Sequence, residues 1–319
     1  MPWGIAVLPD GSALVSLREK AKIVHITPGQ GTQLGRVQAV PTSRADGTVP
    51  GVAPAGEGGL LGIALSPAFA TDHLLYAYFT STSDNRIARM RYADGRLSAP
   101  QVIFSGIPKG LIHNGGRIAF GPDGMLYAGT GEGGSGTRSQ DRKSLGGKIL
   151  RITPDGRVPN GNPFPGSPVW TYGHRNVQGL AWDSQSRMYA SEFGQDTWDE
   201  LNRIVAGHNY GWPVVEGIAH RAGFTDPLRQ WPTSQASPSG ITIVDDVVCM
   251  AALRGERLWR IPLTANGTGT PKALLNGTYG RLRAVVPAPD GGLWLLTDNT
   301  FRGTPRPGDD RLVEVPLPR

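Results

Sequence analysis

Cysteine is almost absent from this chain of 319 residues, because Cys249 is the only one. No disulfide can therefore form within the chain. Cys249 stands among Val247, Val248, Met250 and Ala251, so we expect a small buried strand residue there. No run approaches the roughly 18 apolar residues of a membrane span, and no 3.6-residue periodicity persists over a long window. The sequence predicts a soluble, mostly β protein without a membrane span in this chain.

Targeting signals and charge runs are also lacking. Met1 and Pro2 lead directly into the first apolar run, without the charged segment and apolar core of a signal peptide. Either the protein is cytoplasmic or a leader is missing from this sequence. The net charge is +6, but the basic residues are scattered rather than gathered in a Lys/Arg run. The scattered distribution argues against nucleic acid as a partner, and the positive charge also suits a small anionic ligand.

Glycine and proline are abundant, with 45 and 27 residues, and 39% of the chain is hydrophobic. Dense turns together with enough apolar residues for a core argue against disorder. Six segments repeat one theme, which is an apolar run, a turn rich in Pro, Asp and Gly, and a second apolar run. They are residues 3–16, 60–79, 115–131, 177–194, 238–253 and 281–298. This theme is typical of a β-hairpin.

The themes begin about 45 to 60 residues apart, which is a spacing typical of propeller blades. Six units predict an all-β fold, a six-bladed β-propeller with four-stranded antiparallel blades, formed by residues 1–319 as one domain. Each theme would supply the first two strands of a blade, and the first strands would line a central channel. Residues just before each theme should then meet at the rim of one face.

Polar and ionisable residues stand at this predicted rim in four of the repeats. Glu57 precedes the second theme, His113 and Asn114 the third, and Arg175 and Asn176 the fourth, while Arg281 and Arg283 open the sixth. A channel wall that only has to fold would not need these groups, because burying unpaired charge is costly. Their recurrence indicates a functional site.

A second set of rim positions follows the second strand of each theme. There the sequence has Glu132 in a Gly-rich turn, the run from Ser191 to Asp196, and Arg254 before Gly255. Such turns can expose backbone carbonyls to a hard cation such as calcium. No EF-hand pattern and no Cys/His spacing for zinc is present, so the spacing alone leaves metal binding open.

Read together, these motifs resemble those of the soluble quinoprotein sugar dehydrogenases, the glucose/sorbosone dehydrogenase family that includes the aldose sugar dehydrogenases. The resemblance covers nearly the whole chain. Its motifs are PWGIAVLPDG, GEGGLLGIALSPAF, HNGGRIAFGPDGMLY, SLGGKILRITPDG, YGHRNVQGLAWD, SEFGQDTWDELN, NYGWPVVEG and GRLRAVVPAPDG. It implies a six-bladed propeller that carries pyrroloquinoline quinone (PQQ) and calcium in the mouth of the channel.

The resemblance also implies catalytic roles. His113 falls on the general base that takes a proton from the C1 hydroxyl of an aldose while hydride passes from C1 to the quinone. Glu132 falls where relatives usually have an Asp, and it would orient the imidazole. Arg175 and Asn176 fall on the pair that bonds the reactive quinone carbonyl. A His suits the first role because its ordinary pKa lies close to neutral.

Cofactor and substrate contacts follow in the same way. Arg281 and Arg283 fall on arginines that bind PQQ carboxylates, and Arg254 falls where relatives can carry a Lys toward the cofactor. Glu57 falls on a polar position near the substrate. The backbone carbonyls of Gly194 and Gln195 would bind calcium. No residue between 231 and 240 is assigned to PQQ, because that segment is longer here than in some relatives.

The implied activity is the oxidation of aldoses to lactones, with electrons passed to an external acceptor. A metal-dependent propeller lactonase and a non-catalytic binding module remain as alternatives. The family works outside the cytoplasm, so an extracytoplasmic location (periplasmic, secreted or surface-anchored) is expected if a leader exists. The preferred sugar, the acceptor and the oligomeric state are left open.

Overall fold

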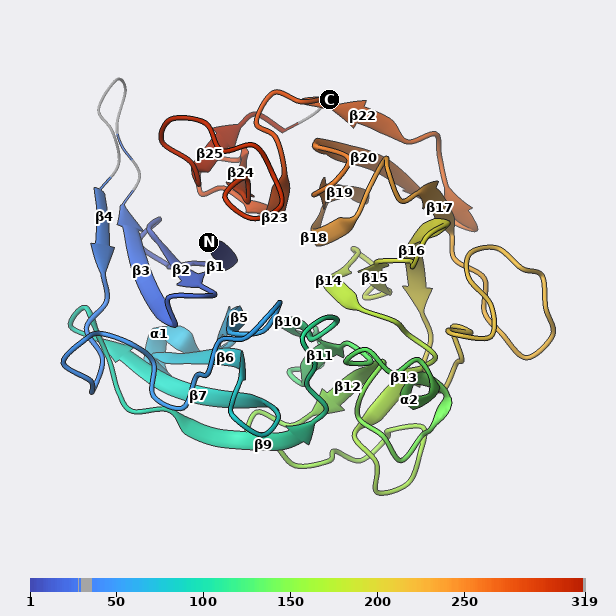
Figure 1. Ribbon diagram of the computed structural model, residues 1–319, viewed down its shortest axis with the longest axis horizontal. Helices are drawn as coiled ribbons and strands as arrows, with labels where there is room; N and C mark the ends of the chain where they lie inside the picture. The colour runs from blue at the N-terminus through green and yellow to red at the C-terminus, as the bar shows by residue number, and fades with distance from the viewer. Residues whose placement is uncertain (28, 30–35, 318–319) are drawn as a thin grey trace.

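The computed structural model of the protein describes residues 1–27, 29 and 36–317. Six antiparallel sheets stand around a central axis as a six-bladed β-propeller (Figure 1). Blade 1 consists of β1 (Pro2–Val7), β2 (Ala13–Leu17), β3 (Lys22–Thr27) and β4 (Arg36–Ala39). Blade 2 consists of β5 (Leu60–Leu65), β6 (Leu74–Thr80), β7 (Asn85–Ala93), β8 (Arg96–Leu97) and β9 (Gln101–Ile107). Blade 3 consists of β10 (Gly115–Phe120), β11 (Leu126–Thr130), β12 (Lys148–Ile152) and β13 (Val169–Tyr172).

Blade 4 consists of β14 (Val177–Trp182), β15 (Met188–Glu192), β16 (Trp198–Ile204) and β17 (Arg229–Pro232). Blade 5 consists of β18 (Pro238–Val244), β19 (Val247–Ala252), β20 (Arg257–Thr264), β21 (Gly267–Thr268) and β22 (Lys272–Leu274). Blade 6 consists of β23 (Leu282–Pro287), β24 (Leu293–Thr297) and β25 (Leu312–Val315). All six predicted hairpins are thus confirmed as the first two strands of a blade.

The blades differ slightly in size. Blades 2 and 5 each carry an extra short strand, whereas blade 6 has three strands in the described part of the chain. The described helices are single turns, α1 (Phe69–Asp72) and α2 (Thr137–Gln140). Neither helix is long enough to cross a bilayer, and the described residues offer no other candidate.

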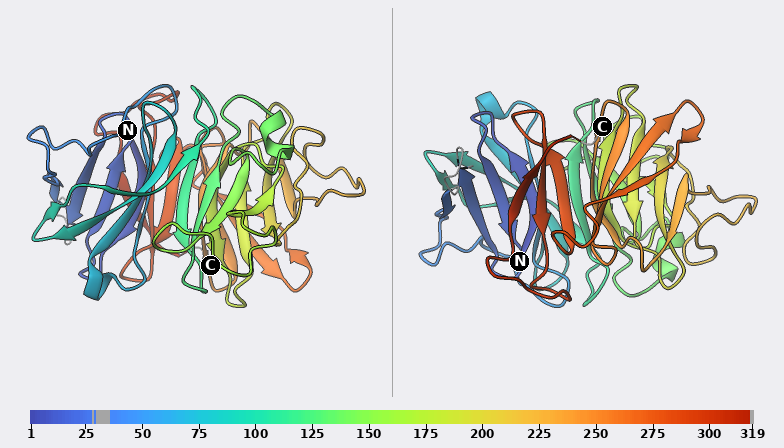
Figure 2. Two further views of the ribbon diagram at one scale, coloured as in Figure 1. Left: turned by 90° about the horizontal axis from the view of Figure 1, so that it is seen from below. Right: turned by 90° about the horizontal axis from the view of Figure 1, so that it is seen from above.

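The first strands β1, β5, β10, β14, β18 and β23 are the innermost, and each packs against the first strand of the next blade (Figure 1). β1 contacts both β5 and β23, so the ring closes. Every blade is covered by neighbours on both faces, which is why inner strands such as β11, β15 and β24 are buried along their whole length rather than alternately. The side views show strands running between two loop-covered faces (Figure 2).

The hydrophobic core consists of layers between adjacent blades. One layer joins Leu14 and Ile23 of blade 1 to Leu60 and Phe79 of blade 2, and equivalent layers fill the other interfaces of the described chain. Cys249 lies in the layer between blades 5 and 6 and is 1% exposed, as predicted for a buried strand residue. Burial of this kind supplies the main driving force for ring closure.

Close approach of the innermost strands needs glycine at particular places. A Cβ on Gly62 would lie 2.2 Å from the carbonyl oxygen of Gly116, and one on Gly179 would lie 2.4 Å from that of Ser239. All six first strands also show a break in register near their N-terminal end. Bulges of this kind turn side chains away from the regular ladder, and here they lie next to the rim residues.

Candidate active site

His113 lies in the turn before β10 and has φ 54, a left-handed conformation that is uncommon for a residue with a Cβ. Its backbone N–H donates to Glu57 Oε2 (3.1 Å), and its ring Nδ1 is hydrogen-bonded to Glu132 Oε1. Among the described residues, nothing bonds the other ring nitrogen, Nε2. The Nδ1 contact fixes the tautomer, so that Nε2 is left with its lone pair available to accept a proton.

Glu132 follows β11 and is almost fully buried, with 3% exposure. Its N–H donates to the Arg175 carbonyl (2.9 Å), and its own carbonyl accepts from Arg138 (3.1 Å). Oε2 is buried without a partner in the described structure. The Glu132 side chain thus reaches the His113 ring from this position, at which the sequence resemblance implied an Asp in relatives.

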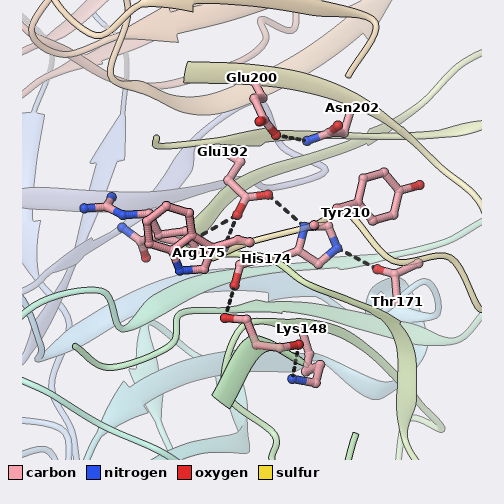
Figure 3. Close-up of polar contacts among 12 residues, drawn as sticks. Lys148, Thr171, His174, Arg175, Glu192, Glu200, Asn202 and Tyr210 are labelled. Atoms are coloured by element: carbon pink, nitrogen blue, oxygen red, sulfur yellow. Dashed lines mark hydrogen bonds and ion pairs between the residues drawn. The ribbon is translucent and has the colours of Figure 1, made fainter. Parts of the chain in front are cut away.

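Arg175 and Asn176 are held by a buried carboxylate that the sequence did not single out. Glu192 Oε1 accepts the backbone N–H groups of both residues, at 3.2 Å for Asn176. Glu192 Oε2 is bonded to Nδ1 of His174 (2.7 Å), and His174 stacks on Tyr210 with ring centroids 4.6 Å apart (Figure 3). The motif contained these residues, but only the fold shows that Glu192 shapes the turn.

The side chains of Arg175 and Asn176 each have a buried hydrogen-bond donor without a partner in the described structure. Asn176 Oδ1 accepts from the Gly115 N–H (2.9 Å), which leaves its Nδ2 buried without a partner. The Arg175 guanidinium lies over the Trp212 ring at 5.4 Å, and its Nε is likewise unpartnered in the described structure. Burial lowers the pKa of Arg175, against the charges of Glu132 and Glu192. Buried unpaired donors are costly unless a ligand satisfies them.

The three other arginines behave differently. Arg283 is 3% exposed and binds Asp298 through Nε (3.0 Å) and Nη2, and Gln178 Oε1 through Nη1 (2.8 Å). Burial lowers the pKa of Arg281, whose Nε is buried without a partner in the described structure. Arg254 is exposed, and its Nη1 lies 3.4 Å from the Thr233 hydroxyl. Thr233 belongs to the segment 231–240, in which no residue was assigned to PQQ, and its hydroxyl is the group of that segment that lies next to the Arg254 guanidinium.

Gly194 and Gln195 form a turn whose N–H groups point at acids. Asp199 Oδ1 accepts from Gly194 (3.0 Å), and Glu216 Oε1 accepts from Gln195 (2.8 Å). No described residue donates to either carbonyl. Burial raises the pKa of Asp199 to about 6, although the N–H groups of Ser237 and Gly194 oppose it. No set of three His, Cys, Asp or Glu side chains suited to a metal occurs in the described residues.

Lys148 braces the segment that begins with Glu132. Its side chain is fully buried, and Nζ donates to the carbonyls of Arg138 (2.7 Å), Ser139 (3.0 Å) and Gly146 (2.7 Å). Burial lowers its pKa to about 7. Sequence reasoning missed this residue, because the motif KIL reads only as the start of a strand.

Glu200 makes the stability of this region depend on pH. Burial and the neighbouring Glu192 raise its pKa to about 8. The native state thus keeps a proton that the unfolded chain releases near 4.5, and the free energy of unfolding falls as the pH rises from about 4.5 to 8. Glu200→Gln should remove the contribution of this group to the pH dependence, and the slopes should differ by up to about 1.4 kcal/mol per pH unit. Urea unfolding at several pH values measures it.

Glu256→Gln is the control for this prediction, because the same substitution is made at a side chain that forms no hydrogen bond or ion pair among the described residues. Parallel pH profiles of the wild type and Glu200→Gln would mean that Glu200 is already ionised in the native state.

Comparison with known proteins identifies relatives over almost the full chain. The aldose sugar dehydrogenase YliI of Escherichia coli is 29% identical over 94% of this chain and 87% of its own. Quinoprotein glucose dehydrogenase B of Acinetobacter calcoaceticus is 30% identical over 70% of this chain and 51% of its own. The PQQ-bound aldose sugar dehydrogenase of Streptomyces coelicolor is 60% identical, with a TM-score of 0.93, over 98% of this chain and 93% of its own.

These similarities define the protein as a propeller oxidoreductase of the quinoprotein sugar dehydrogenase class. It belongs to the glucose/sorbosone dehydrogenase family, whose model matches residues 1–303. The resemblance drawn from the sequence motifs is confirmed. The roles of the individual residues stay predictions, which the geometry above supports to different degrees.

Proposed function

We propose that the protein binds PQQ and calcium at the mouth of the channel and oxidises the C1 hydroxyl of aldose sugars to lactones. The observation that carries the proposal is the group of buried donors without partners. Asn176 Nδ2, Arg175 Nε and Arg281 Nε are all unsatisfied among the described residues. Quinone carbonyl and carboxylate oxygens are acceptors, so PQQ fits this donor set.

In this proposal His113 Nε2 takes the proton of the C1 hydroxyl, and Glu132 stabilises the imidazolium that results. Arg175 and Asn176 donate to the region where negative charge develops, which is often the largest catalytic contribution. Glu57 lies next to the His113 backbone and contacts the sugar. When bound, PQQ supplies the hydride acceptor, and calcium supplies Lewis-acid polarisation.

Arg281, Arg283 and Arg254 supply positive charge toward the cofactor carboxylates. Arg281 has the free donor, whereas Arg283 is tied to Asp298, so we assign Arg281 the more direct contact. The carbonyls of Gly194 and Gln195 would hold calcium, because they are free of protein donors in the described structure and carbonyl oxygens are ligands that calcium accepts. An extracytoplasmic location and an external electron acceptor complete the proposal.

A titration of the metal-stripped protein with PQQ and calcium chloride tests the proposal. Dye reduction with glucose, xylose and maltose is expected to be saturable and to require both additions. Asn176→Asp is the matched variant, because it keeps the acceptor for Gly115 and removes the free donor. We expect it to lower kcat by about 10²–10³. Failure of the wild type to bind PQQ at micromolar concentration would reject the proposal.

A further inference from the structure

Arg302 reaches across the mouth of the channel to the residue proposed to contact the sugar. It lies between β24 and β25 of blade 6, and its Nη1 is 2.9 Å from Oε1 of Glu57, 245 positions away in sequence. The other oxygen of Glu57 accepts the His113 N–H (3.1 Å). Arg302 is thus separated from the proposed base by a single carboxylate.

Stability does not explain this contact. The Arg302 side chain is 60% exposed and that of Glu57 19%. Ion pairs with this much solvent contribute little to folding. Arg302 also has φ 57, a left-handed conformation that disfavours a residue with a Cβ. Backbone strain of this kind is concentrated at functional sites.

The segment that carries Arg302 is firmly braced. The Phe301 ring is contacted by the Arg18 guanidinium (4.3 Å from the centroid) and by that of Arg302 (4.9 Å). The N–H of Asn299 donates to Asp310 Oδ1 (2.6 Å). A Cβ on Gly303 would lie 2.7 Å from Cδ of Arg281, so the segment packs directly against that arginine. The guanidinium is therefore presented in a defined position.

The pair keeps hydrogen-bonding capacity for a ligand. Within residues 1–27, 29 and 36–317, only Glu57 bonds the Arg302 guanidinium, so Nε and Nη2 remain free to donate. Each Glu57 oxygen has one protein donor and can accept another. A free donor beside a free acceptor matches two neighbouring hydroxyl groups, of which one donates to Glu57 and the other accepts from Arg302.

We propose that Arg302 is a specificity-determining residue that, together with Glu57, holds one pair of neighbouring hydroxyl groups of the aldose. The inference rests on the proposed function and adds a contact from blade 6 to those from blades 2 and 3. It accounts for the exposed, strained and braced position of Arg302.

The test compares kcat/KM for glucose with that for 2-, 3-, 4- and 6-deoxyglucose in the holoenzyme. Arg302→Asn removes the guanidinium with a residue that tolerates positive φ. In the wild type, kcat/KM should be about tenfold or more lower for at least one deoxy sugar than for glucose. In the variant, this difference in kcat/KM should shrink to about twofold. The penalties for hydroxyl groups that do not contact Arg302 should stay unchanged.

Arg306→Met is the matched control, because Arg306 lies in the same segment but bonds the carbonyls of Thr278 (2.6 Å) and Gly277 (2.9 Å). Arg302→Lys keeps the charge without the guanidinium fork and should restore only part of the selectivity. Identical deoxy-sugar penalties in the wild type and Arg302→Asn would overturn the inference while leaving the proposed function intact. A wild type without PQQ-dependent activity on any aldose would reject both.

Discussion

Replacing His113 by asparagine is expected to lower kcat for aldose oxidation by about 10²–10⁴, because the variant loses the group proposed as general base. Affinity for PQQ should change little, since no free donor of the site is removed. Asparagine is preferred to alanine because residue 113 has φ 54, and Asn is enriched in that region. Steady-state dye reduction gives the rate, and fluorescence titration with PQQ gives the affinity.

His73→Asn is the control for this variant. His73 also has φ 54, but it follows α1 in the turn between β5 and β6, at the opposite end of blade 2 from the rim. Its replacement should leave kcat at the wild-type value. If His113→Asn kept full activity as well, the proton would have to leave through another group, and Glu57 would become the next candidate.

Replacing Asp298 by alanine is expected to lower the free energy of unfolding by about 3–5 kcal/mol, the usual cost of leaving a buried charge without its partner. Asp298 is fully buried and accepts from Arg283 Nε (3.0 Å). Burial raises its pKa, although the charges of Arg283 and Arg281 act in the opposite direction. Arg18 and Arg117 lie near Arg283 and add positive charge, which makes the Asp298 carboxylate more important. Denaturant unfolding measures the loss.

The double variant Asp298→Ala, Arg283→Met separates charge from packing. Because it removes the uncompensated guanidinium, it should be more stable than Asp298→Ala alone, so that the two substitutions are strongly non-additive. Additive losses would show that Asp298 acts through packing rather than by neutralising Arg283.

The repeat pattern predicted the fold well because the residues within each hairpin are enough to specify its two strands and its turn. A turn such as Pro122 to Gly124 between two apolar runs specifies β10 and β11 without reference to the rest of the chain. The outer strands were harder to predict. They are largely exposed, as in β4 and β9, and their number depends on pairing with the strand beside them. That the whole chain is one domain stays a prediction.

Part of the candidate site was also visible in the sequence. Glu57, His113, Glu132, Arg175 and Asn176 were named from motifs and their rim position, and the structure brings them into one connected set of contacts. The predicted cofactor contacts of Arg254 and Arg283 have less direct support, since Arg254 is exposed and Arg283 is bonded to Asp298. Three supporting residues were not singled out, because a Glu or Lys in a strand and an Arg in a loop look ordinary, even where a quoted motif contains them. They are Glu192, Lys148 and Arg302.

The sequence by itself determined the six hairpins, their order around the ring and the chemical types available at the rim, because alternation, turn residues and motif spacing are local properties. Only the tertiary structure decided which rim groups meet and which are already satisfied. Arg283 and Asp298 are 15 positions apart, His113 and Glu57 are 56, and Arg302 and Glu57 are 245. The first contact lies within the β23–β24 hairpin, the second joins neighbouring blades, and the third depends on closure of the ring between blade 6 and blade 1. No local pattern in the chain encodes the second and third contacts.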